Sequence, residues 1–277
     1  MEHVSSYLTP EIKLSCYEDK FFKSEIIFEQ HMLIWFISGQ TKIVQAEETH
    51  VFKTGDIFLI PRNIPATIIN TPADGLPHKT VVMLLTEKVL KDFYSALDVK
   101  AAPTPRATIC SFRRHPLLES CLASLIPYFA ISEPFPDNLA ALKIKEAISI
   151  LRAIDPGIDG MLANFDDPHK VELISFMEKN YMFNMTTEKF SYLTGRSLTT
   201  FKRDFKKAFN TTPQRWLTHK RLELAHYQLA EQQRKPLDVC YETGFENLSH
   251  FSYAFKKQFG YSPTALLGPA AGRQRQS

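Results

Sequence analysis

One phrase occurs twice in the chain, as FKRDFKKAFNTTP over residues 201–213 and as FSYAFKKQFGYSP over residues 251–263. Both copies follow the pattern F-x3-F-K-K-x-F-x3-P, and their first phenylalanines lie 251 − 201 = 50 residues apart. A spaced pattern that returns at a fixed distance indicates two copies of one supersecondary unit. The repeat therefore constrains the C-terminal part of the chain more than any other feature does.

Each copy predicts a helix with one packed face. At about 100° per residue the apolar side chains fall on one stripe. The expected packed positions are Leu198, Phe201, Phe205 and Phe209 in the first copy, and Leu248, Phe251, Phe255 and Phe259 in the second. The opposite faces are polar and basic. We expect the phenylalanines to be core residues and the opposite faces to carry the function.

A short helical stretch and a glycine precede each of these helices. The first stretch covers 186–195 and ends at Gly195, and the second covers 236–244 and ends at Gly244. Glycine readily adopts the positive φ that often ends a helix. Each copy thus predicts a helix-turn-helix unit, whose second helix enters the major groove of DNA.

The segment between the two units predicts one continuous helix from Pro213 to Ala230. Such a helix is about 27 Å long at about 1.5 Å per residue. It could hold two recognition helices roughly one DNA turn apart, about 34 Å. The charge is also divided: residues 168–277 hold 17 Lys and Arg against 9 Asp and Glu, whereas residues 1–167 hold 16 against 21. Only the C-terminal part is therefore expected to face a polyanion.

These residues resemble the DNA-binding domain of AraC/XylS-type transcription regulators. The family phrase GF-x5-F-x3-F-K-x2-F-G-x2-P is matched by GFENLSHFSYAFKKQFGYSP from Gly244 to Pro263, and the linker-helix phrase R-L-x2-A-x3-L is matched by RLELAHYQL from Arg221. The resemblance covers about the last 100 residues.

The resemblance implies which side chains contact DNA. Base contacts would come from Thr199, Lys202 and Arg203 in the first unit, and from Ser249, His250 and Tyr253 in the second, with Ser197 and Asn247 at the two helix starts. Arg203 is the best single candidate, because a guanidinium can donate two hydrogen bonds to guanine. Tyr253 stands where the family often has Arg, so base readout by the second unit is expected to be weaker. Lys206, Lys207 and Lys256 are expected to contact phosphates or to remain solvated.

The N-terminal part predicts strands between residues 26 and 85, with turns at Gly39 and Gly55. This order is similar to the cupin-type barrel that is commonly fused ahead of AraC-type domains. The expected fold class is α+β: a cupin-like domain over 1–154 with helices at about 115–130 and 138–154, a linker over 155–167 and an all-α DNA-binding domain over 168–268. The aromatic side chains of Trp35, Phe36, Phe52 and Phe58 could fill the barrel or line a cavity. The helix over 138–154 could pack on the barrel or form a dimer seam.

No catalytic residue, metal ligand or cofactor is expected. The segment PRNIPATIIN over 61–70 has Ala66 where metal-binding cupins place a histidine ligand, and an alanine cannot bind a metal. The chain also lacks a G-x-S-x-G phrase, a P-loop and a GxGxxG phrase. The four cysteines are far apart in the sequence, which favours small buried side chains over a zinc site.

These observations predict a sequence-specific DNA-binding transcription regulator. An activator is favoured over a repressor. Its expected partners are double-stranded DNA, RNA polymerase (by family resemblance), a second copy of the chain and an unidentified small-molecule effector or protein. No apolar run approaches the ~18 residues of a membrane span, so we expect no membrane partner and a cytoplasmic location. Two alternatives stay open: a cupin-type metal enzyme with an accessory basic domain, and an architectural protein that binds all duplexes alike.

Overall fold

The computed structural model describes residues 3–17, 22–46, 48–95, 97, 108–112, 114–131, 136–245 and 247–266. The chain forms two compact units, Met1–Asp166 and Asp167–Ser277, and each is described by itself. The expected residues 267 and 268 of the DNA-binding domain lie outside the described ranges.

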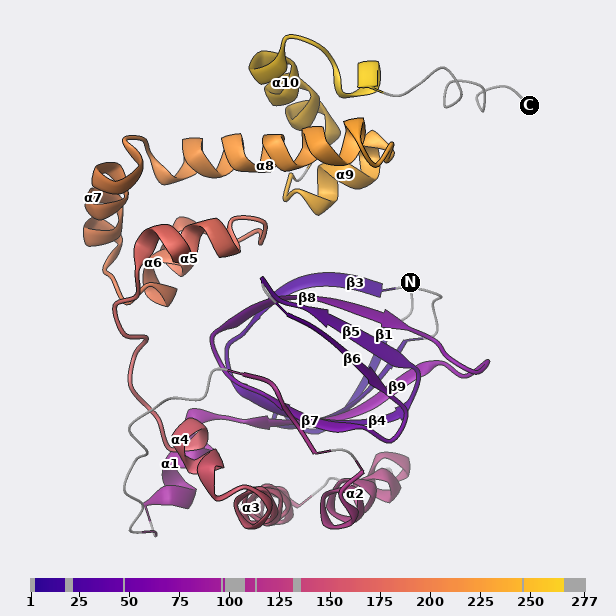
Figure 1. The fold of residues 1–277 in the computed structure, drawn as a ribbon. Coiled ribbons are helices and arrows are strands. Elements are labelled where there is room, and N and C mark those ends of the chain that lie inside the picture. Colours follow the sequence, from indigo (N-terminus) through magenta and orange to yellow (C-terminus); the bar gives the residue numbers. More distant parts are fainter. Residues whose placement is uncertain are drawn as a thin grey trace. The chain divides into compact units, whose positions relative to one another are not determined.

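The first unit contains two antiparallel sheets that enclose a common interior (Figure 1). One sheet has the strand order β1-β2-β9-β4-β7-β10 and the other β3-β8-β5-β6. The strands are β1 His3–Thr9, β2 Ile12–Tyr17, β3 Phe22–Phe28, β4 His31–Ser38, β5 Gln40–Val44, β6 Thr49–Lys53, β7 Ile57–Ile60, β8 Ile64–Thr71, β9 His78–Leu85 and β10 Cys110–Ser111. The α+β class and the N-terminal β domain are confirmed.

The turn between β4 and β5 requires glycine. Gly39 has a φ of +86°, and a Cβ there would lie 2.7 Å from the Cα of His78 on β9. A side chain would therefore meet both a strained backbone and a clash with a neighbouring strand. Gly39, which predicts this turn in the sequence, also allows β9 to lie close to the turn.

Side chains on successive strand residues point to opposite faces, so strands β4, β7 and β9 of the first sheet each contribute to two cores. On β4, Ile34 and Phe36 belong to the buried cluster between the sheets, whereas Leu33 and Trp35 belong to the cluster on the outer face. Phe58 stacks on Phe52 with ring centroids 3.8 Å apart. Of the four aromatic residues considered in the sequence, three thus face the interior and Trp35 faces the helices.

Helices cover the outer face of the first sheet. They are α1 Glu87–Tyr94, α2 Pro116–Ala123, α3 Asp137–Ile154 and α4 Asp159–Leu162, with 3₁₀ turns η1 Ile126–Ala130 and η2 Pro156–Ile158. The buried side chains of α3 are Ala140, Ile144, Ala147, Ile148 and Leu151, and they join the outer cluster. The structure therefore places most of the apolar stripe of α3 against the barrel. Leu142, also on α3, is 59% exposed.

The segment expected to be a linker is folded over most of its length. Ile158, Met161 and Leu162 are buried in the outer cluster of the first unit. Asp159 accepts hydrogen bonds from Arg152 Nε at 2.6 Å and from the Tyr94 hydroxyl at 2.6 Å, which fastens the segment to α3 and α1. Three apolar side chains and one paired carboxylate hold the segment against the barrel and its helices. The first unit accordingly ends at Asp166.

The second unit is helical. Its elements are α5 Leu173–Asn180, α6 Thr187–Leu193, α7 Leu198–Phe209, α8 Pro213–Ala230, α9 Pro236–Glu242, α10 Leu248–Phe259 and the 3₁₀ turn η3 Pro263–Leu266. Residues 213–230 form the single helix that the sequence predicts. Within the described ranges of both units, no helix combines the length and the apolar character needed to cross a bilayer.

Candidate DNA-binding surface

Two glycines set the turns of the helix-turn-helix units. Gly195 follows α6 with a φ of +64°, and a Cβ there would lie 2.5 Å from the backbone of Pro168 and His169. Gly244 follows α9 with a φ of +80°. Before each glycine, a buried threonine hydroxyl donates back into its helix: Thr194 to Phe190 O at 2.9 Å, and Thr243 to Val239 O at 2.7 Å. The repeat thus extends into the turns.

The first recognition helix, α7, buries one face and exposes the other. Phe201 and Phe205 are completely buried, and Leu198 and Phe209 are partly buried. The predicted DNA-contacting side chains Thr199, Lys202, Arg203, Lys206 and Lys207 are all exposed. The structure brings these five together on one helix.

The second recognition helix, α10, repeats this arrangement with one difference. Phe251 and Phe255 are completely buried, but Leu248, expected on the packed stripe, is 38% exposed. Ser249, His250, Tyr253 and Lys256 are exposed, and Tyr253 is 67% exposed. A large aromatic side chain therefore stands in solvent at the centre of this face.

Two of the predicted contact residues are helix caps. The Ser197 hydroxyl accepts a hydrogen bond from Thr200 N at 3.3 Å at the start of α7. The Asn247 Oδ1 accepts one from His250 N at 2.7 Å at the start of α10. Capping by such a side chain typically stabilises a helix by about 1 kcal/mol. Both side chains thus have a structural role, and at most their unused atoms are free for DNA.

Arg203 belongs to a charged network. Its Nε and Nη2 donate to Asp204 Oδ1 at 3.3 and 3.2 Å. The other carboxylate oxygen of Asp204 accepts from Arg196 Nε at 3.2 Å, and Arg196 Nη1 also donates to the carbonyls of Val171 and Thr194. Burial opposes ionisation of Asp204, but the hydrogen bonds from Arg196 and Arg203 outweigh it, so the pKa of Asp204 is lowered. One edge of the Arg203 guanidinium is therefore engaged with a carboxylate, and this contact competes with a contact to a base.

The helix α8 connects the two helix-turn-helix units and packs against both. Near its start, Trp216 packs on Phe205 and Phe209, with ring centroids 5.7 and 4.8 Å apart. Toward its end, Leu222, Ala225 and Leu229 form one buried cluster with Phe251 and Phe255. Figure 1 shows α7 at one end of α8, and α9 and α10 at the other. The 18 residues of α8 span about 27 Å.

A polar groove of about 530 Å³ lies between the start of α6, the middle of α8 and the start of α10. Thr186, Gln214 and Thr218 are among its lining residues, and the sequence analysis did not predict them. They come from two distant segments, the start of α6 and the first turns of α8, and match no short motif, so no local signal could have found them. Arg221, also in the groove, donates to the carbonyls of Tyr181 and Phe183 and so holds the loop after α5.

No cluster of three His, Cys, Asp or Glu side chains that could hold a metal ion occurs among the described residues. Ala66 is completely buried on β8, at the position considered for a ligand. The free cysteines Cys121 and Cys240 are buried, as expected for small core residues, whereas Cys16 and Cys110 are partly exposed.

Comparisons with known proteins give matches to both compact units of the chain. A family profile described as a helix-turn-helix domain matches residues 192–268, and one described as the ExsA N-terminal regulatory domain matches residues 31–155. The HTH-type transcriptional regulator ExsA of Pseudomonas aeruginosa is 26% identical over 235 residues, which cover 82% of each chain. The virulence regulon transcriptional activator VirF of Yersinia enterocolitica is 28% identical over 166 residues, covering 59% of this chain and 60% of VirF.

Among solved structures, an apo ToxT variant of Vibrio cholerae aligns with 93% of this chain and 97% of its own, at 12% identity and a TM-score of 0.46. ExsA and VirF are both named as regulators of transcription, and neither is named as an enzyme. The enzyme alternative therefore gains no support from them.

Proposed function

Because the chain belongs to the AraC/XylS-type transcription regulators, we propose that it reads specific sequences of duplex DNA with α7 and α10 and activates transcription at those sites. The observation that carries the proposal is the pair of exposed polar and basic helix faces at the two ends of α8. A spacer of about 27 Å is close to the roughly 34 Å that separates successive major grooves on one side of B-DNA.

We propose separate roles for the exposed side chains. Arg203, Thr199 and Lys202 read bases in one major groove, with Arg203 giving the strongest discrimination. Ser249, His250 and Tyr253 read bases in the next groove. Lys206, Lys207 and Lys256 contact phosphates, and Ser197 and Asn247 act mainly as caps that aim the two helices.

The first unit is proposed to control this activity through an effector or a protein partner. The contacts of Arg62 support a way in which a change in the barrel could reach the end of the first unit. Arg62 Nη2 donates to the carbonyls of Asn164 and Asp166, each at 2.9 Å, so the barrel holds the last residues of the unit. Ile60, two residues earlier, lines a cavity inside the barrel. A change in the cavity thus lies close to the point where the chain leaves the first unit.

We further propose that the protein associates with a second copy of itself and contacts RNA polymerase. Leu142 on α3 is 59% exposed and Leu117 on α2 is 56% exposed, which supports a second copy of the chain as the partner of this helical face. A dimer would bring four helix-turn-helix units to paired sites. The named activity of VirF supports activation, and we propose that the protein works with RNA polymerase in the cytoplasm.

Selection of bound sequences from a randomised duplex pool tests the DNA-reading proposal. Full-length protein is used at near-physiological salt, and a variant with Lys88→Ala on α1 serves as a control for the loss of a positive charge outside the helix-turn-helix units. We expect an enriched motif with two blocks about one helical turn apart. Folded protein that binds all duplexes with similar affinity would favour an architectural role and overturn the proposal.

A further inference from the structure

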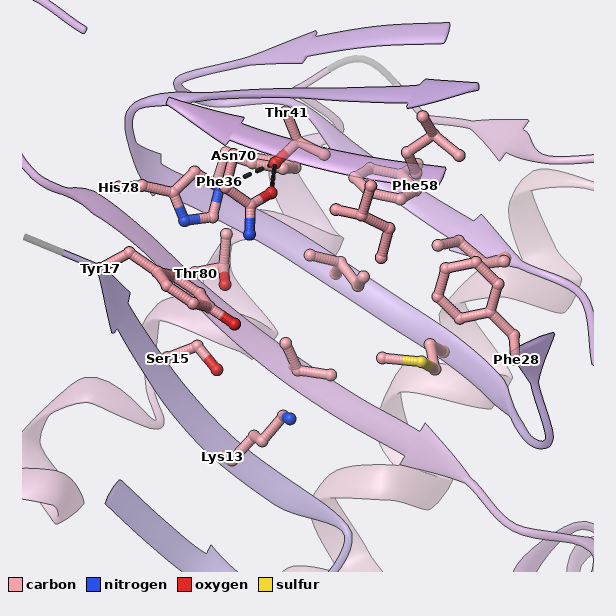
Figure 2. A pocket seen from close by; sticks show the side chains of 16 residues that line it. Lys13, Ser15, Tyr17, Phe28, Phe36, Thr41, Phe58, Asn70, His78 and Thr80 are labelled. Carbon is pink, nitrogen blue, oxygen red and sulfur yellow. Dashed lines mark hydrogen bonds between the residues drawn. The ribbon is translucent and has the colours of Figure 1, made fainter. Parts of the chain in front are cut away.

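The barrel contains a cavity of about 270 Å³ between its two sheets (Figure 2). Protein cores rarely contain voids larger than a water molecule. This cavity has the volume of about nine water molecules. Its lining comes from β2, β4, β7 and β9 on one sheet and from β3, β5 and β8 on the other. The space is therefore a property of the whole barrel and not a gap at one loop.

One end of the cavity is apolar. Phe28, Met32, Ile34 and Ile60 are among the residues that line it, and Figure 2 shows Phe28 far from the polar side chains. Phe36 and Phe58 also line the cavity, and the Phe36 ring meets the His78 ring edge-on with centroids 5.4 Å apart. An occupant would therefore need an apolar body that lies against these side chains.

The other end of the cavity buries polar side chains. Ser15, Thr41, Asn70, His78 and Thr80 line it, and none is more than 7% exposed. Buried polar groups are costly unless they find hydrogen-bond partners. A barrel that only needed a filled core would place apolar side chains here.

A hydrogen-bond chain fixes the orientation of these groups. The Thr41 hydroxyl donates to Asn70 Oδ1 at 2.7 Å and lies 2.7 Å from His78 Nε2. Its single hydrogen is used on Asn70, so the hydroxyl accepts from His78 Nε2–H. The Asn70 amide nitrogen is then left on the cavity side, and Figure 2 shows it and the Thr80 hydroxyl turned toward the open space.

The polar end carries no charge. Burial lowers the pKa of His78 to about 4, so its ring is neutral at physiological pH. Among the described lining residues Lys13 alone is charged, and it pairs in register with the apolar Val82 on β9, which places it away from Asn70 and His78. Its ammonium lies 6.0 Å from the ring centroid of Tyr7. A buried anion at the polar end would lack a charged partner, which disfavours an anionic head group there.

We propose that this cavity binds a small neutral amphipathic molecule with a short apolar body and one uncharged oxygen-bearing head, such as an amide, a ketone or an alcohol. The head oxygen accepts hydrogen bonds from the Asn70 amide and the Thr80 hydroxyl, and the body lies toward Phe28. That such a ligand acts as the effector rests on the proposed regulatory function, whereas its binding does not.

Calorimetric titration of the full-length protein tests the ligand class. The probes are phenylacetamide, phenylacetate and ethylbenzene, which share one body and differ in the head. We expect the amide to bind, and the isosteric anion and the hydrocarbon to bind at least about tenfold more weakly. Tighter binding of phenylacetate that is lost in Lys13→Met would overturn the neutral head, and absence of binding by all three would overturn the proposal.

Variants locate the site. Thr80→Val keeps the side-chain shape and removes one donor, so the affinity for the amide should fall about two- to tenfold. Thr49→Val makes the same change on the exposed face of β6 and should have no effect. Val82→Phe should fill the cavity and abolish binding, with circular dichroism as the check on folding. If the wild type and Thr80→Val bind the amide with equal affinity, the head group does not lie at the polar end of the cavity.

DNA binding measured on the same samples separates the two proposals. If the amide binds but the occupancy of the selected DNA motif does not change, the cavity is a binding site and effector control through it fails. If the motif is bound and no probe enters the cavity, the regulator stands and the ligand class is wrong.

Discussion

Replacing Arg203 with alanine should relax sequence discrimination without unfolding the protein. The side chain is 64% exposed, so its removal should change the free energy of unfolding by less than about 0.5 kcal/mol. A bidentate contact with guanine gives about 2 kcal/mol of discrimination. Leaving Asp204 costs about 0.5 kcal/mol, because the ion pair is exposed on the Arg203 side. The difference, about 1.5 kcal/mol, corresponds to slightly more than a tenfold loss in the affinity ratio.

Competition binding measures this ratio, with the selected motif competing against duplexes that carry one changed base. Lys207→Ala is the matched control, since it removes a positive charge from the same helix. It should weaken all duplexes alike and reduce the slope of log affinity against log salt by about 1. If Arg203→Ala weakens specific and random DNA equally, Arg203 contacts the backbone and its assignment as a base reader is wrong.

Three further changes test the packing, the assembly and the buried histidines. Trp216→Ala should lower the free energy of unfolding by about 3–5 kcal/mol in urea titrations, because the ring is 8% exposed and packs on two phenylalanines of α7; a loss below 1 kcal/mol would contradict its role as an anchor. Leu142→Asp should shift a dimer toward monomer in sedimentation experiments at unchanged thermal stability, and a wild-type protein that is monomeric at all concentrations would contradict the seam. The free energy of unfolding should fall as the pH falls from about 6.5 to 4. Burial, followed by the Arg62 charge, lowers the pKa of His31 to about 3, and burial lowers that of His78 to about 4, so in this window the unfolded chain binds protons that the folded chain does not. Constant stability across this range would contradict the burial of the two rings.

The second unit could be predicted closely because its signals are local. Phenylalanines at helical spacing, a glycine at each turn and a proline at the first position of α8 each act within a few residues of themselves. The bounds Pro213–Ala230 follow from such signals. The network of Arg203, Asp204 and Arg196 could not be predicted in the same way, because Arg196 is held by the carbonyl of Val171, 25 residues away.

The first unit was less predictable because its packing is decided between distant strands. Alternation along β4 predicts two faces, but only the pairing of β4 with β7 and β9 decides that Trp35 faces the helices. The folding of residues 156–162 onto the barrel depends on Arg152 and Tyr94, which a local reading of Pro and Gly could not include. The cavity is of the same kind, since Thr41, Asn70 and His78 are brought together from three strands.

The two copies of the repeated phrase share the positions that pack and a pair of exposed lysines, and they differ at most of the positions proposed to read bases. Phe201 and Phe205 correspond to Phe251 and Phe255 at an offset of 50 residues, and all four are completely buried. At the same offset, Arg203 and Asp204 correspond to Tyr253 and Ala254. The second copy therefore lacks this charged pair. In the proposed function the two helices thus carry dissimilar faces in equivalent positions, one suited to guanine and one offering an aromatic ring to apolar base edges such as the thymine methyl. A binding site made of two unlike blocks, and not a direct repeat, follows from this difference.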